Sequence, residues 1–159
     1  LHFNNRNIKK SICILFVFCC FAISCFAGNP LYTGTWKGSI ISNTDDPDNR
    51  NGLAVTLNII DDNDAGELVG EMIIQYRYQT DLYKAKYKVL GMINYENMTM
   101  YLEQSKLIYY DLLPKGYQWC FGIGTFEILR NPYRKKNYLD GYMTTNCGDE
   151  KLRMVLIKK

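Results

Sequence analysis

Side chains suited to acid–base or nucleophilic chemistry are few in this sequence. Its only histidine is His2, which falls in a leader that we expect to be removed. Without an imidazole, the mature chain cannot form a Ser-His-Asp or Cys-His triad or a histidine metal site. Catalysis would therefore have to use carboxylates, since an Asp or Glu pair can hydrolyse glycosides without histidine.

Four glutamates stand on segments that look like strands: Glu71, Glu96, Glu103 and Glu127. Nothing in their spacing places two of them across a cleft, and their positions fit the solvated faces of a sheet. We therefore predict that the protein is not an enzyme and that it uses no cofactor.

Two acidic runs imitate the beginning of a calcium-binding loop. The first runs from Asp61 to Gly66 (DDNDAG), but its twelfth position is Met72, where a calcium loop needs a bidentate glutamate. The second, with Asp45, Asp46 and Asp48, fits no better. We interpret both runs as turns and predict no metal site.

Aromatic residues are the more promising candidates, because the chain has 13 tyrosines. Tyr76, Tyr78, Tyr83 and Tyr87 fall on the apolar faces of a predicted hairpin, around its turn. Together with Trp36 they would suit a sugar, a flat ligand or a protein partner at the mouth of a barrel. A small barrel also needs large side chains simply to fill it. The tyrosines could therefore form a binding site or fill the interior, and both interpretations stay open.

Lysines alternate with apolar residues between Tyr83 and Val89. The spacing of Lys84, Lys86 and Lys88 fits a strand with the lysines on one face, and it fits no helix. With Arg77, these lysines could form a basic stripe for an acidic polymer or a lipid headgroup. We favour the simpler interpretation, an outer sheet face whose lysines discourage association.

The same period of two recurs along the chain, without any sustained helical period. We predict eight strands, at residues 32–42, 53–60, 67–79, 83–94, 98–105, 117–129, 137–146 and 151–158. Glycines beside large apolar residues, at Gly70, Gly91 and Gly141, predict bulges or tight bends. The fold class is therefore all-β. We favour an eight-stranded antiparallel up-and-down barrel, because closure removes exposed sheet edges, and a β-sandwich is the alternative.

Residues 1–27 have the layout of a secretory signal peptide. Arg6, Lys9 and Lys10 form a positive region, and an uncharged, largely apolar run follows to Ala27. Cleavage after Ala27 would release a soluble protein. A bacterial lipobox, Ala22-Ile-Ser-Cys25, would instead leave an acylated Cys25 as a membrane anchor. Either way we predict an exported protein of the periplasm, cell surface or extracellular space.

The mature chain, residues 28–159, has the size of one domain with one core. Without the leader it keeps 16 basic residues against 16 acidic ones, so it shows no electrostatic footprint for nucleic acid. Four of the six cysteines leave with the leader. The remaining pair, Cys120 and Cys147, is expected to form a disulfide in an oxidising compartment.

Two resemblances follow from the motifs. The Gly34-Thr-Trp36 strand ahead of a meander of strands resembles the start of the calycin barrels, the lipocalins and avidins. The order Trp119-Cys120, Leu139-Asp140-Gly141, Cys147-Gly148 and an alternating tail resembles small exported β-barrel proteins of Gram-negative bacteria. The first resemblance implies a barrel, and the second implies export without a known activity.

The function that these observations favour is binding. We expect a barrel that binds a small hydrophobic molecule or a glycan at an aromatic mouth formed by Trp36 and the four tyrosines. The alternative is a protein-interaction module, such as an inhibitor or a surface accessory factor, that uses its loops. A pocket open at one end would favour the first, and a filled interior with an exposed aromatic patch would favour the second.

Overall fold

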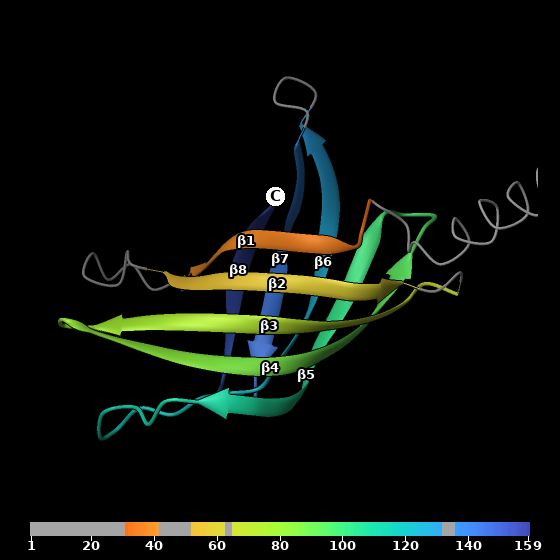
Figure 1. The fold of residues 1–159 in the computed structure, drawn as a ribbon. Helices are drawn as coiled ribbons and strands as arrows, with labels where there is room; N and C mark the ends of the chain where they lie inside the picture. The colour runs from red at the N-terminus through yellow and green to blue at the C-terminus, as the bar shows by residue number, and fades with distance from the viewer. Residues whose placement is uncertain (1–30, 42–51, 63–64, 132–135) are drawn as a thin grey trace, which may run out of the picture.

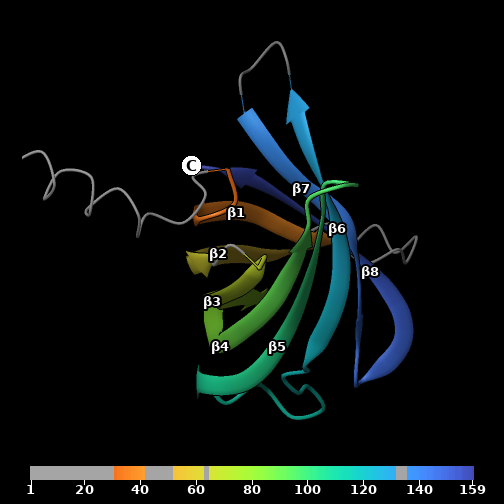
Figure 2. The same cartoon turned by 90° about the vertical axis from the view of Figure 1, so that its right-hand side faces the viewer.

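The computed structural model of the protein describes residues 31–41, 52–62, 65–131 and 136–159. They form eight antiparallel strands in which each strand pairs with the next along the chain, and the last strand pairs with the first (Figures 1 and 2). This closed up-and-down barrel confirms the predicted architecture and excludes the alternative, a β-sandwich. The predicted leader and the acidic positions Asp45, Asp46 and Asp48 lie outside the described residues.

The strands are β1 (Gly34–Ile41), β2 (Leu53–Asp62), β3 (Glu67–Tyr78), β4 (Asp81–Asn94), β5 (Thr99–Tyr110), β6 (Gly122–Asn131), β7 (Lys136–Thr145) and β8 (Gly148–Lys158). Among the described residues, no helix is long and apolar enough to cross a membrane.

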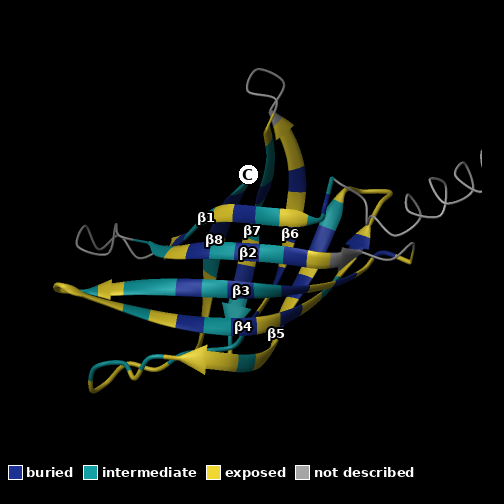
Figure 3. Ribbon diagram, in the orientation of Figure 1, coloured by how far each residue is buried: buried dark blue, intermediate teal, exposed yellow. Residues whose placement is uncertain are grey.

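Alternation along β4 sets the inside and the outside of the barrel. Ala85, Tyr87 and Val89 are buried, whereas Lys84 and Lys88 are exposed. Figure 3 shows buried and more exposed positions alternating along the strands. The predicted faces of this strand are confirmed. The opposite register would bury unpaired ammonium groups, which is costly, and would expose apolar side chains whose burial is favourable.

Strand β5 runs further than its sequence suggests. It was predicted to end at residue 105, but it continues to Tyr110, which lies opposite Ala85. The β4–β5 pairing shifts register twice, at Lys86/Tyr87 and at Lys88/Val89, and the residues left without a partner, Ile108 and Ser105, are on β5. Bulges of this kind break the period of two, so the far half of β5 gives no clean alternation in the sequence.

The predicted strand at 117–129 is wrong in its first part, because β6 begins at Gly122. The spacing of Tyr117, Trp119 and Phe121 mimics strand alternation, yet these residues belong to the β5–β6 loop.

The turn between β4 and β5 also differs from the prediction at two residues. Met98, the first residue of the predicted strand 98–105, has a φ of 55° and is 37% exposed in the turn. Glu96 also lies in the turn and not on a strand.

Interior glycines allow neighbouring strands to approach closely. A Cβ atom at Gly38 would lie 1.9 Å from the Val155 carbonyl oxygen, and one at Gly141 would lie 2.2 Å from that of Thr125. Both contacts are with backbone that cannot move aside, so these positions accept glycine alone. The predicted role of strand glycines in tight bending fits this arrangement.

One end of the barrel is filled by aromatic side chains. Trp36 is fully buried, and its indole N–H donates a hydrogen bond to the carbonyl oxygen of Tyr32 at 3.0 Å. Tyr32 meets Tyr95 edge-on, with ring centroids 5.5 Å apart. The Lys158 ammonium lies 5.5 Å from the centre of the Trp36 ring, and burial lowers the pKa of this lysine.

Candidate binding site

The opposite end of the barrel is hollow. We call it the mouth: it is the end that carries the β3–β4 turn and the loop 111–121, at the left of Figure 1. A cavity of about 280 Å³ opens there. Its lining is mainly apolar and aromatic and consists of Ile40, Leu53, Ile74, Tyr76, Tyr87, Gln104, Leu113, Tyr117, Gln118, Trp119, Cys120, Met143, Thr145 and Leu152. None of these side chains carries a charge.

The loop 111–121 forms one wall of the cavity and is tied to β4 through Asp111. The Asp111 N–H donates to the Lys84 carbonyl oxygen at 2.8 Å, and the Lys84 N–H donates to the Asp111 carboxylate at 2.8 Å. The Tyr109 hydroxyl donates to the same carboxylate. These hydrogen bonds stabilise the charged carboxylate and so lower the pKa of Asp111, and the bond from Tyr109 has the largest effect.

Trp119 is positioned by the same anchor. Its indole N–H donates to the Asp111 carbonyl oxygen at 2.8 Å. The ring is half-buried, packs against the hydrophobic core and lines the cavity. This explains why the segment leaves the sheet: its backbone is directed over the mouth and does not extend the β5–β6 ladder.

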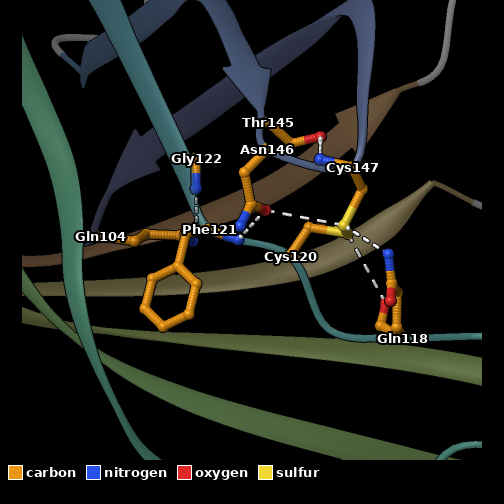
Figure 4. Close-up of a disulfide and its surroundings, with 8 residues drawn as sticks. All are labelled: Gln104, Gln118, Cys120, Phe121, Gly122, Thr145, Asn146 and Cys147. Carbon is orange, nitrogen blue, oxygen red and sulfur yellow. Dashed lines mark hydrogen bonds between the residues drawn. A yellow bond between two sulfur atoms is a disulfide. The ribbon is translucent and has the colours of Figure 1, made fainter.

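A disulfide closes the other side of the mouth (Figure 4). Cys120 and Cys147 are bonded, with Cα atoms 5.8 Å apart and a sequence separation of 27, which confirms the predicted pair. Phe121 and Asn146 reinforce the link: the Phe121 N–H donates to the Asn146 side chain at 2.9 Å, and the Asn146 N–H donates to the Phe121 carbonyl at 3.0 Å. The bridge thus joins the β5–β6 loop to the β7–β8 turn. A disulfide is also consistent with an oxidising, exported location.

Gln104 is the one polar residue buried in the described core, and it lines the cavity. Its side-chain oxygen accepts a hydrogen bond from the Gly122 N–H at 2.7 Å, and Figure 4 shows this contact. Its amide nitrogen donates to the Met72 sulfur at 3.1 Å. A thioether is a weak acceptor, so the NH₂ group is poorly satisfied for a buried donor.

Tyr87 is a second buried polar group of the cavity wall. Its side chain is fully buried, and its hydroxyl has no hydrogen-bond partner among the described residues. Its ring meets Phe121 edge-on, with centroids 5.6 Å apart. Burial disfavours the charged phenolate, which raises the pKa of Tyr87 to about 12.

Three tyrosines form a cluster at the rim. Tyr76, Tyr78 and Tyr117 have ring centroids between 5.5 and 6.3 Å apart, within the range of favourable aromatic pairs. Tyr76 and Tyr117 also line the cavity. The pKa of Tyr76 is raised, mainly by burial and to a smaller extent by the hydrogen bond with Tyr117.

The structure brings together only part of the aromatic site predicted from the sequence. Tyr76 and Tyr87 line the cavity, and Tyr78 packs against Tyr76. Tyr83 lies opposite Tyr76 in the β3–β4 register but does not contribute to the lining. Trp36 is separated from all four, because its place early in β1 puts it in the filled end.

Sequence reasoning missed Tyr117, Trp119 and Gln104. The first two were assigned to a strand, so their position over the mouth was not foreseen. Gln104 did carry a signal, because it continues the inward series of Met100 and Leu102 on β5. A polar residue at an inward position of a small barrel is a candidate ligand contact.

The carboxylates considered for catalysis lie away from the cavity. Glu71 pairs with Lys86 on the outer face, with 2.8 Å between the charged atoms, and both Glu103 and Glu127 are exposed. Within the part of the chain that the structure describes, no group of three His, Cys, Asp or Glu side chains is placed to hold a metal ion.

Comparison of the chain with protein-family models, with curated proteins and with solved structures found no significant match. The functional argument therefore depends on the geometry of the mouth.

Proposed function

We propose that this protein is an exported, non-enzymatic barrel that binds a small, mainly apolar molecule in the cavity at its mouth. The observation that carries the proposal is the cavity itself: about 280 Å³ enclosed by uncharged, largely apolar and aromatic side chains. Such concave sites with few polar groups are typical of small-ligand binding. Export is supported by the disulfide Cys120–Cys147, and membrane attachment through Cys25 remains a prediction.

The cavity volume limits the size of the ligand. At the ~30 Å³ that each water molecule occupies in the liquid, the cavity has room for on the order of ten non-hydrogen atoms. A larger ligand, or a glycan, would extend past the rim onto Tyr76, Tyr78 and Tyr117. Tyrosine faces suit the apolar faces of sugars and flat rings alike.

A protein-interaction role is the second candidate, and a separate surface supports it. Leu82, Tyr109, Tyr110 and Leu112 are between 42% and 82% exposed at the lip where β4 and β5 meet the loop 111–121. Apolar side chains left exposed on neighbouring segments are available for contact with a partner. The cavity favours the first candidate, because a loop-based binder has no need of a hollow interior.

Tryptophan fluorescence tests the first candidate, because the two tryptophans lie at opposite ends of the barrel. Titration with 2-ethylnaphthalene, an uncharged hydrocarbon of suitable size, is expected to quench Trp119 in a saturable manner. Trp119→Phe leaves Trp36 as the only tryptophan, buried in the filled end. This variant should bind the hydrocarbon with little change in emission.

The control for binding itself is calorimetry on both proteins. Saturable heat in the wild type and in Trp119→Phe, with quenching only in the wild type, is the expected result. Absence of saturable binding in the wild type would overturn the cavity proposal and leave the protein-interaction role. Equal quenching in the two proteins would place the hydrocarbon away from the mouth.

A further inference from the structure

Two of the polar side chains in the cavity wall, Tyr87 and Gln104, are deeply buried, and they determine what the ligand must offer them. Tyr87 lies on β4 and Gln104 on β5, where Gln104 is opposite Val89. Tyr87 and Val89 are two positions apart on the same interior face, so Tyr87 and Gln104 are diagonal neighbours across the two strands. Among the described residues that line the cavity, these two are the most deeply buried ones with a polar side chain.

Both groups are hydrogen-bond donors that the protein leaves incompletely paired. The Gly122 N–H fixes the Gln104 oxygen at 2.7 Å, which leaves the NH₂ group with only the Met72 sulfur at 3.1 Å. The Tyr87 hydroxyl is buried without a partner among the described residues. Buried donors without good acceptors are rare in native proteins because they are costly, so their occurrence together in a cavity wall indicates a ligand that completes them.

The lining also restricts the charge of the ligand. Among the described residues that line the cavity, none is a lysine, arginine, aspartate or glutamate, so a charged ligand atom there would be buried with no counter-ion from this part of the wall. That cost exceeds what one or two neutral hydrogen bonds return. The acceptor must therefore be a neutral oxygen.

We infer that the cavity selects uncharged, mainly apolar molecules that carry one hydrogen-bond-accepting oxygen, such as a ketone or ester carbonyl, held by Tyr87 and Gln104. This inference depends on the proposed function, because it specifies the ligand of the same cavity. Apolar contacts with the aromatic lining supply most of the affinity. The two donors orient the ligand and distinguish it from a hydrocarbon of the same shape.

Three probes with one ring system separate these contributions. They are 2-acetylnaphthalene, which carries a neutral carbonyl, 2-ethylnaphthalene, which lacks the oxygen, and 2-naphthoate, which is charged. Calorimetry on the wild type is expected to rank the ketone about tenfold tighter than the hydrocarbon, as one good hydrogen bond to buried donors implies. The carboxylate should bind at least tenfold more weakly than the ketone.

Tyr87→Phe removes one donor and keeps the ring. The preference for the ketone over the hydrocarbon should fall at least threefold in this variant, while affinity for the hydrocarbon stays the same or rises. Tyr101→Phe makes the same chemical change on the exposed outer face and should leave the preference unchanged. The infrared carbonyl stretch of the bound ketone gives an independent measure: it should lie at lower wavenumber in the wild type than in Tyr87→Phe.

Two outcomes overturn the inference and leave the proposed function intact. One is equal affinity of the wild type for the ketone and the hydrocarbon. The other is tightest binding of the naphthoate, which would require a cation at the site. If none of the three probes binds, the proposed function fails together with the inference.

Discussion

At the scale of single residues, Tyr87 shows a conflict between stability and function. Its ring packs tightly in the interior, yet its buried hydroxyl finds no hydrogen-bond partner within the described part of the chain. An unsatisfied buried hydroxyl costs about 1–3 kcal/mol, and phenylalanine would fill the same space without that cost. Residues that are suboptimal for folding are often found where a protein binds something.

Titration of Tyr87 gives a test that does not need a ligand. Its pKa is about 12 in the folded protein against 10.0 ordinarily. Between pH 10 and pH 12 the unfolded chain therefore loses a proton that the folded chain keeps, and stability falls with rising pH. Below pH 10 this contribution is fully present.

Over that range the wild type should lose about 2 kcal/mol more unfolding free energy than Tyr87→Phe. Urea denaturation at several pH values measures the difference, and the variant corrects for the other tyrosines. At neutral pH the variant should be at least as stable as the wild type, since no hydrogen bond is lost. Parallel pH profiles for the two proteins would contradict the buried position of the hydroxyl.

At the scale of elements, the loop 111–121 and the β7–β8 turn decide the shape of the mouth. The loop is joined to β4 through Asp111 and to the turn through the disulfide Cys120–Cys147. Because Trp119 and Cys120 both line the cavity, the same links that order the loop also preorganise the binding site. Preorganisation reduces the entropy lost on binding.

Replacing both cysteines by serine should therefore affect stability and binding together. Closing a loop of this length stabilises the folded state by roughly 3–4 kcal/mol in the chain-entropy model. We expect a loss of about that size in denaturant melts, and several-fold weaker binding of 2-ethylnaphthalene as the loop loosens. Unchanged affinity in a variant that still folds would mean that the bridge stabilises the barrel without shaping the mouth.

Strand positions were predicted well where one face is buried and the other is solvated. Strand β4 is the clearest case, because its lysines and apolar residues alternate without interruption. The prediction was wrong around Tyr117 to Phe121, where alternation of large side chains arises in a loop. There the long-range contacts of Asp111 and Cys147 determine the backbone, and no local pattern contains that information.

At the scale of the whole molecule, the barrel is filled at one end and hollow at the other. Trp36 and Tyr32 fill one end, and Tyr95 packs against Tyr32 there, whereas the lining of the other end leaves space. The sequence predicted a closed barrel, because eight alternating strands leave few other ways to protect their edges. It could not predict which end would be hollow, since that depends on how side chains from different strands meet.

Blocking the mouth is the most direct test of a ligand-binding barrel. Leu53 lines the cavity at the beginning of β2, so Leu53→Trp should fill part of the space. Leu82 is 42% exposed and is not part of the lining, which makes Leu82→Trp the matched control. Circular dichroism would establish that both variants keep the fold.

The decisive measurement is calorimetric titration of 2-acetylnaphthalene into the wild type and these two variants. We predict saturable binding at one site in the wild type and in Leu82→Trp, with an affinity at least tenfold lower in Leu53→Trp because the added ring occupies the cavity. Unchanged affinity in Leu53→Trp, or no saturable binding in the wild type, would contradict the assignment of the mouth as a ligand site.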